Sequence, residues 1–352
     1  MSSDEIAAAT ATADVDSLPR AALPGQWTLF WGRFRRDKFA VVSGIVLVLL
    51  ILACLVLEPI LERLLGHGPN EIFPGATNFA AKPVGPWSWV VDSTSSAAET
   101  TDRTLFVLGG DGSLGRDEFL RLLKGGQASL TVGLGSTLLA VLVGVPVGAL
   151  AGLLGGRTDA LVSRMTELFM GFPILLLFVA MSWSVRQRVE EVTLGGLFAP
   201  GVFALTILIG AFTWFYPARI TRATVLQLQR QEFVEASRMI GASTWRIVYS
   251  HMFPHLVGPI ATYFAIIAAA NIVLESAISF LNIGIPLPDP SWGNMLATNW
   301  GHFFIVDRPS VRGVVTTWWT TFWPAAAIAL TVLCLTLFAE GVRRAFDPGA
   351  RR

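Results

Sequence analysis

Residues 130–154 read LTVGLGSTLLAVLVGVPVGALAGLL and contain no charged side chain. A helix needs about 20 consecutive apolar residues to cross the hydrocarbon core of a bilayer. Because a backbone in lipid has no water to bond with, a run of this length is expected to be helical. The stretch therefore predicts a membrane-spanning helix, and it decides the fold class.

Three glycines recur at every fourth position of this run, namely Gly144, Gly148 and Gly152. On a helix this spacing places them on one face, where a neighbouring backbone can approach closely. Glycine is also common in membrane helices without such a role. The strict register favours a helix-packing face.

The composition of the whole chain agrees with a membrane protein. Of its 352 residues 53% are apolar and only 14% are charged, whereas soluble domains carry about 25% charged residues. The net charge of +1 identifies no nucleic-acid partner. Cys54 and Cys334 both lie in apolar runs, so we expect buried thiols rather than a disulfide.

Apolar runs long enough to cross a membrane occur six times, at residues 39–57, 130–154, 165–184, 197–216, 256–281 and 314–339. The first run lacks a small-residue cleavage site and is expected to remain as a span. The expected fold class is an all-α polytopic membrane protein with six transmembrane helices. Prolines in or beside the spans, which can kink a helix, are Pro146, Pro173 and Pro254.

Basic residues next to the spans set the expected orientation. They precede the first run and follow the last one, and they are Arg33, Arg35, Arg36, Lys38, Arg343, Arg344, Arg351 and Arg352. Both termini are therefore expected in the cytoplasm.

This orientation divides the chain into five expected parts. The sequence between the first two spans is rich in Gly, Pro and Ser, carries Trp87 and Trp89, and lies outside the cell. The parts are a cytoplasmic segment 1–38 with 1–24 disordered, a first span 39–59, an extracytoplasmic insert 60–127, a membrane domain 128–341, and a cytoplasmic tail 342–352.

A polar stretch separates the fourth and fifth spans, residues 232–255, EFVEASRMIGASTWRIVYSHMFPH. Phe233, Ala236 and Ile240 fall on one face of a helix. Gly241 then supplies the freedom that ends a helix, and Ser243 can cap the next one. We expect two short helices, at about 228–254, with a surface suited to docking on another protein.

Three other interpretations of this stretch deserve comparison. A DNA-binding helix-turn-helix has similar spacing, but membrane spans on both sides keep a duplex away. A metal site at His251 and His255 has no third ligand at a suitable spacing. A folded loop that merely joins two spans remains as the plain alternative.

Polar residues inside the spans form a second group of candidates, namely Glu167, Asn271 and Glu275. Intramembrane carboxylates are costly and mark either a transport pathway or a polar pairing between helices. The sequence leaves both roles open for these residues.

The stretch 232–255 resembles the EAA signature of the membrane subunits of ABC importers. More narrowly, the chain resembles the "C"-type permease subunit of the peptide/nickel importer family. Supporting motifs extend from residue 28 to the end, and they include LGRDEFLRLLKGG, GGRTD, LESAISFLNIGIPLPDPSWGNML and RRAFDP. The chain departs from the pattern at Ser237, Phe253 and Asn282, and its insert is longer than in most relatives.

The resemblance implies a type I ABC importer permease fold in a bacterial cytoplasmic membrane, and it implies a role for the polar stretch. Its coupling residues would be Glu235, Ala236, Ser237, Gly241 and Pro254. The implied partners are a homologous "B"-type permease, two cytoplasmic ATPase subunits and an extracytoplasmic substrate-binding protein. The implied solutes are peptides, with nickel chelates, haem or another solute as alternatives.

ATP hydrolysis is not expected in this chain. A phosphate-binding loop needs Gly-Lys-Ser/Thr, and the lysines Lys38, Lys82 and Lys124 are preceded by Asp, Ala and Leu. The chain is therefore expected to bind no cofactor, and ATP and Mg²⁺ would belong to the partner ATPase subunits. A secondary transporter or a membrane enzyme is the alternative class, but neither explains the polar stretch.

Overall fold

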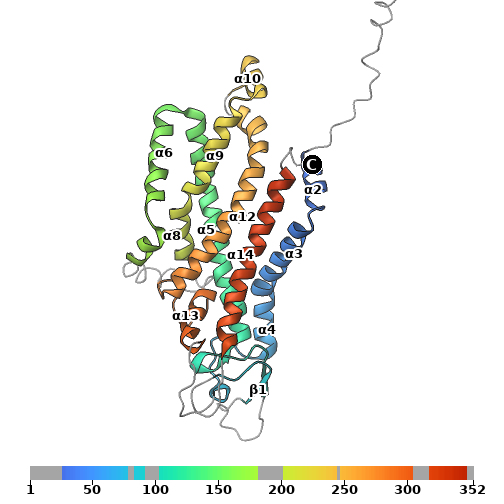
Figure 1. Cartoon of the computed structure of the whole chain (residues 1–352), viewed down its shortest axis with the longest axis vertical. Helices are drawn as coiled ribbons and strands as arrows, with labels where there is room; N and C mark the ends of the chain where they lie inside the picture. Colours follow the sequence, from blue (N-terminus) through green and yellow to red (C-terminus); the bar gives the residue numbers. More distant parts are fainter. Residues whose placement is uncertain are drawn as a thin grey trace, which may run out of the picture.

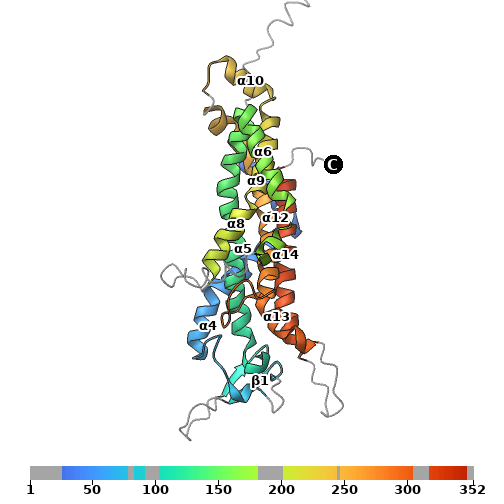
Figure 2. The same ribbon diagram turned by 90° about the vertical axis from the view of Figure 1, so that its left-hand side faces the viewer.

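The computed structural model describes residues 26–77, 83–91, 103–180, 201–243, 246–303 and 317–346. The segment expected to be disordered, 1–24, and the end of the tail, 347–352, lie outside these ranges. So do the parts of three expected spans at 181–184, 197–200 and 314–316. Long helices run side by side along the molecule, with α10 at one end and β1 at the other (Figures 1 and 2). We call these the α10 end and the β end.

Five helical segments are long and apolar enough to cross a membrane. They are Lys38–Leu65, Glu118–Leu154, Val202–Leu228, Ile247–Phe280 and Trp318–Phe346. A sixth span results if Gly156–Gly171 and Ile174–Ala180, which meet at a 72° bend, count as one. The bend lies at Pro173, which the sequence marked as a possible kink.

The spans consist of named helices whose bounds are as follows. The first comprises α3 (Lys38–Leu52), a π-helical turn η2 (Ala53–Leu57) and α4 (Glu58–Leu65); α2 (Gln26–Phe34) precedes it, α5 is Glu118–Leu154 and α6 is Gly156–Gly171. Then come α8 (Val202–Thr213), α9 (Phe215–Leu228), α10 (Glu232–Met239), η5 (Ile247–Met252), α12 (Phe253–Phe280), α13 (Trp292–Phe303) and α14 (Trp318–Phe346).

Most of these helices extend beyond the apolar runs that predicted them. Helix α5 begins at Glu118, so it takes residues from the expected insert 60–127, and α4 takes residues from the insert's other end. Helix α6 begins at Gly156, well before the run at 165–184. Hydropathy detects only the lipid-facing part of a helix, whereas the hydrogen-bond ladder continues into polar sequence that still favours helix.

Helix α5 packs against α8, α9 and α12 in the interior of the bundle. The glycines of its stripe lie against α9, and a side-chain carbon added at Gly148 would overlap the carbonyl oxygen of Ala218. At Gly152 it would lie 2.8 Å from a methyl group of Val225. The α5 and α9 backbones therefore approach so closely that only glycine fits at these positions.

The β end carries a small cap built from two antiparallel pairs of strands. Strand β1 (Ser88–Val91) pairs with β2 (Arg103–Phe106), and β3 (Gly110–Asp111) pairs with β4 (Arg116–Asp117); single 3₁₀ turns are η3 (Pro74–Ala76) and η4 (Gly112–Leu114). Phe73, Val90 and Phe106 form the cap's own apolar core. The Trp319 indole of α14 donates to the carbonyl of Gly110 at 3.3 Å, so the cap is fixed to the bundle.

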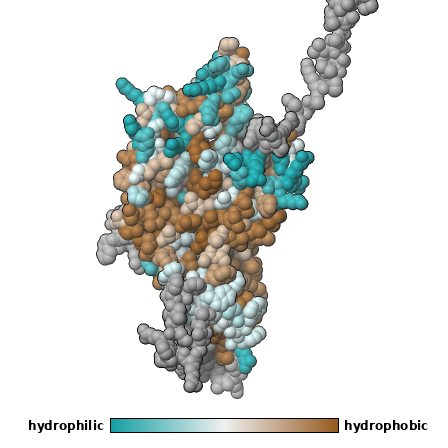
Figure 3. Space-filling model, in the orientation of Figure 1, coloured by the Kyte–Doolittle hydropathy of each residue, from teal (hydrophilic) through white to brown (hydrophobic). Residues whose placement is uncertain are grey.

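A hydrophobic band crosses the middle of the face shown in Figure 3, with hydrophilic residues gathered above it at the α10 end. Many large apolar side chains are exposed on α3, where Phe39, Val42 and Leu49 are examples. Such a band matches the hydrocarbon core of a bilayer.

Candidate functional site

The polar stretch forms a separate projection at one end of the bundle. Helix α10 lies at the tip, beyond the ends of α9 and α12 (Figures 1 and 2). The chain leaves α9 at Leu228, forms α10 from Glu232 to Met239, turns, and returns through η5 into α12. The stretch therefore has the helix, turn and helix that the sequence predicted, although residues 244–245 lie outside the described ranges.

One side of α10 is anchored to the bundle. Val234 is fully buried in an apolar cluster with Val225, Met252 and Leu256. Buried Ser237 donates its hydroxyl to the carbonyl of Phe233 at 2.7 Å, which satisfies the polar atom within the helix. Helix α10 is thus held by contacts to both spans that it connects.

The outward side of α10 carries the residues that the sequence analysis placed on one helix face. Phe233 is half-buried, but Ala236 and Ile240 are exposed. Met239 and Ile240 are 86% and 85% exposed, the highest values among the large apolar side chains that the structure describes. Phe233, Ala236 and Ile240 thus lie on the side away from the bundle, while Val234 and Ser237 occupy the interior side.

A left-handed glycine makes the turn at the tip. Gly241 has φ +79°, and its N–H donates to the carbonyl of Arg238 at 3.0 Å. The Ser243 hydroxyl then accepts from the backbone N–H of Arg246 at 3.4 Å, the capping role predicted for it. Pro254 lies where the π-helical η5 continues into α12, and it has no N–H to donate to the preceding turn.

The tip is connected to the rest of the bundle through α9. The Arg222 guanidinium forms a two-pronged ion pair with Asp159 at the start of α6, with Nη2 to Oδ2 at 2.7 Å. The Gln229 amide donates to the carbonyls of Gly152 and Leu153 at the end of α5. The close glycine contact lies on the same helix, so α9 connects the tip to both α5 and α6.

The intramembrane polar residues fall into different surroundings. Asn271 donates to the hydroxyls of Ser136 and Thr137 at 3.1 and 3.0 Å. Glu275 is fully buried and accepts from the Ser279 hydroxyl at 2.7 Å. Glu167 is 64% exposed and pairs with Arg164 on its own helix at 3.0 Å. Ser129 of α5 and Ser291 before α13 also hydrogen-bond to Glu275. Asn271 and Glu275 therefore both join α12 to neighbouring elements, while Glu167 faces outward.

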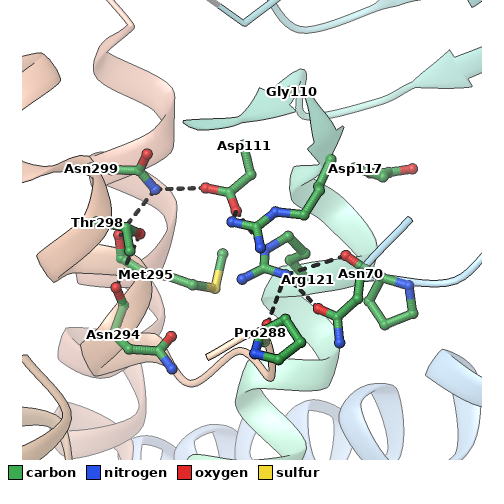
Figure 4. Close-up of polar contacts among 12 residues, drawn as sticks. Asn70, Gly110, Asp111, Asp117, Arg121, Pro288, Asn294, Met295, Thr298 and Asn299 are labelled. Carbon is green, nitrogen blue, oxygen red and sulfur yellow. Dashed lines mark hydrogen bonds and ion pairs between the residues drawn. The ribbon is translucent and has the colours of Figure 1, made fainter. Parts of the chain in front are cut away.

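A buried charged cluster joins the cap to the bundle at the β end (Figure 4). Asp111 accepts from Arg116 at 3.1 Å and from Asn299 at 2.7 Å. Its Oδ2 also forms an ion pair with Arg121 of α5, with both side chains fully buried. Arg121 donates in addition to Asn70 Oδ1 at 2.6 Å and to the carbonyl of Pro288 at 3.3 Å. The cluster therefore joins the cap to α5, to the loop before α13 and to α13 itself.

A buried histidine lies beside this cluster. His67 Nε2 is 3.2 Å from Asp117 Oδ2, and its Nδ1 is 3.2 Å from the carbonyl oxygen of Leu65. Both partners only accept hydrogen bonds, so the ring satisfies both when both its nitrogens are protonated. Asp117 also caps α5 by accepting from the backbone N–H of Phe119 at 2.8 Å.

We expect the stability of the cap to fall as pH rises through neutrality. Burial, the largest influence, lowers the pKa of His67, but the hydrogen bond to Asp117, the Leu65 carbonyl and the charges of Asp117 and Glu71 together raise it above its usual value. Because the folded state holds the proton more tightly, the protonated ring stabilises the cap. This contribution is fully present below the unfolded pKa of about 6.5, and it is lost as pH rises through the pKa of the folded state.

The measurement compares melting temperatures of the wild type and a His67→Asn variant between about pH 5.5 and about pH 8. The wild-type value should decline more steeply with rising pH than the value for the variant, which lacks the titrating ring. Parallel profiles for the two proteins would contradict the prediction.

Comparisons with known proteins place the chain. Residues 144–352 match the model of the family described as "binding-protein-dependent transport system inner membrane component". Residues 25–81 match that of the "N-terminal TM domain of oligopeptide transport permease C". The first match covers more than half of the chain. This protein belongs to the binding-protein-dependent transport system inner membrane component family.

Curated members of this family resemble the chain over most of its length. The oligopeptide transport system permease protein OppC of Bacillus subtilis is 28% identical over 98% of this chain and 96% of its own. The dipeptide transport system permease protein DppC of the same species is 30% identical over 92% of this chain and 85% of its own. A chain of the MetNI methionine ABC transporter, in an inward-facing form, is 17% identical with a TM-score of 0.48, over 64% of this chain and 96% of that one.

Family membership confirms the predicted class. The chain is an ABC transporter permease component, all-helical in its membrane part, with the type I importer permease fold, and it is a multi-pass protein of the inner membrane. The relatives are transport permeases, so this result favours neither a secondary transporter nor a membrane enzyme.

Sequence reasoning missed two parts of the candidate site. Met239 was given no role and Ile240 was only grouped with Phe233 and Ala236, because local sequence does not show which apolar residues of a short helix stay exposed. The pairing of Asp111 with Arg121 and Asn299 was also missed. No local pattern reveals it, because Asn299 is far along the chain from the other two.

Proposed function

We propose that this chain is one of two permease subunits of an ATP-driven importer, and that α10 couples it to an ATPase subunit. The observation that carries the proposal is the exposed pair Met239 and Ile240 at the tip. Large apolar side chains so exposed at the polar end of a membrane protein suit a groove on a soluble partner. Beside them, Ala236 leaves room for close approach, and Glu235 is available to a basic group.

The α10 end is then the cytoplasmic end. The supporting observation is the excess of Lys and Arg beside the spans, which the positive-inside rule assigns to the cytoplasm. Both termini follow this assignment, and the β end faces outward. ATP and Mg²⁺ would bind to the ATPase subunits, since this chain lacks a phosphate-binding loop.

Peptides are the proposed solutes. The support is the names of the relatives, which include oligopeptide, dipeptide and di/tripeptide permeases. A nickel chelate, haem or another solute is the alternative.

The proposed partners are a homologous "B"-type permease and a substrate-binding protein at the β end. A second permease is needed because one tip engages one ATPase subunit, whereas closure over ATP requires two. Exposed Trp87 and Trp89 on the cap suit contact with the binding protein.

The docking role can be tested by co-purification. We expect Met239→Ser combined with Ile240→Ser to reduce the ATPase recovered with the tagged permease about tenfold or more, because central apolar anchors commonly contribute 2 kcal/mol or more to an interface. The matched control combines Ile72→Ser with Leu114→Ser, two exposed apolar residues at the β end. Equal ATPase recovery from both double variants would show that the tip is not the docking site.

A further inference from the structure

A cavity of about 840 Å³ opens on the side of the bundle formed by α2, the start of α3 and the end of α14. Four basic side chains line it together with a single acid and an aromatic ring. These residues are Arg33, Arg36, Lys38, Arg344, Asp37 and Phe39. The surplus of positive charge distinguishes it from the two mainly apolar cavities near α5 and α6.

Aromatic contacts hold the wall of the cavity in place. Phe30 of α2 packs on Phe346 of α14 with ring centroids 4.4 Å apart. Phe34 meets Phe338 edge-to-face at 5.7 Å. Since these contacts join α2 to the last span, the cavity is part of the folded protein rather than a gap beside a loose segment.

The acid in the cavity is already engaged. Asp37 Oδ1 accepts from the N–H of Ala40 as the N-cap of α3, at 3.2 Å. Its Oδ2 accepts from Arg344 at the same distance, and Arg344 also pairs with Glu340 at 3.1 Å. Within the described part of the chain Arg36 and Lys38 pair with no carboxylate, so they are available to a ligand from outside.

The cavity lies at the boundary between water and lipid. Phe39, which is 75% exposed, lines it, and Val42 continues an exposed apolar surface along α3. Trp27 and Trp31 are exposed on α2, and Trp is enriched at membrane interfaces. In Figure 3 hydrophilic residues gather beside α2 and the end of α14, directly above the hydrophobic band.

We propose that this cavity binds the headgroup of an anionic phospholipid. Arg36 and Lys38 would contact its phosphate, and the acyl chains would lie along Phe39 and Val42 on α3. Basic pockets between membrane helices at an interface suit such headgroups. The exposed apolar wall favours a lipid over a free anion, because a free anion has no acyl chains to bury against it. The site concerns neither the tip nor the solute, so it stands independently of the proposed function.

The test measures phosphatidylglycerol retained by the full-length protein in mild detergent. We expect Arg36→Gln with Lys38→Gln to weaken retention about 30-fold, because each basic group near an anionic lipid surface contributes about a fivefold factor. The matched control is Arg35→Gln with Arg63→Gln, which removes the same charge. Arg35 stacks on Trp31 at 5.1 Å and Arg63 lies on α4, so neither lines the cavity.

Native mass spectrometry counts the bound lipids, with phosphatidylcholine and inorganic phosphate as competing probes. Support consists of retention by the wild type and the control, loss in the cavity variant, and no displacement by either probe. Equal retention by the two double variants would overturn the proposal. Displacement by inorganic phosphate at low concentration would overturn the lipid assignment in favour of a free anion.

Discussion

Asp111→Asn should destabilise the protein by about 3–5 kcal/mol, the cost of removing one partner from a buried ion pair. Asp111 is fully buried and faces Arg121, also fully buried, and Arg116, which is 7% exposed. Without its charge, the two guanidinium groups remain away from water, and the fully buried Glu118 is the carboxyl group that remains beside them. Asp111 uses one oxygen for Asn299 and the other for the two guanidinium groups. Asparagine has only one acceptor oxygen, so one of these sets of contacts is lost and the join between the cap, α5 and α13 weakens.

Thermal unfolding of the purified protein in mild detergent measures this effect. The control is Asp289→Asn, because Asp289 accepts from the neutral Asn70 amide at 3.0 Å and an amide oxygen replaces it in that bond. We expect the control to lose less than about 1 kcal/mol. Adding Arg121→Met to Asp111→Asn should recover part of the loss, since it removes one of the unpaired charges. Equal melting temperatures for Asp111→Asn and Asp289→Asn would refute the role of this pair.

Gly241→Val should reduce peptide uptake about tenfold or more while the permease still reaches the membrane. At φ +79° valine is strained by about 1–2 kcal/mol. A side-chain carbon at this position meets no atom within 4 Å, so the effect acts through the backbone of the turn alone. The strain is too small to unfold the bundle but large enough to change where Met239 and Ile240 point.

Uptake of a radiolabelled dipeptide at equal membrane levels, with the partner subunits co-expressed, gives the readout. Gly66→Val is the matched control, because Gly66 has φ +73° and equally open surroundings but lies at the β end. Gly241→Asn should retain most of the uptake, since asparagine tolerates the left-handed region. Wild-type uptake by Gly241→Val, or equal losses in both valine variants, would argue against a coupling role for this turn.

Local sequence determined much of this protein. A run such as residues 130–154 predicts a span because burial in lipid depends on a continuous stretch of side chains. Gly241 and Ser243 predict a turn and a cap because backbone conformation and short-range hydrogen bonds depend on adjacent residues. The family resemblance rested on these same local motifs, and the comparisons confirmed it.

Tertiary structure decided what local patterns leave open. The sequence placed Phe233, Ala236 and Ile240 on one face, yet contacts with Val225 and Leu256 from other helices selected Val234 for the interior and left the tip exposed. Asp111, Arg121 and Asn299 meet only because α5 and α13 pack beside the cap. Helical periodicity limits which residues share a face, but the choice of the buried face depends on which distant surfaces it can cover.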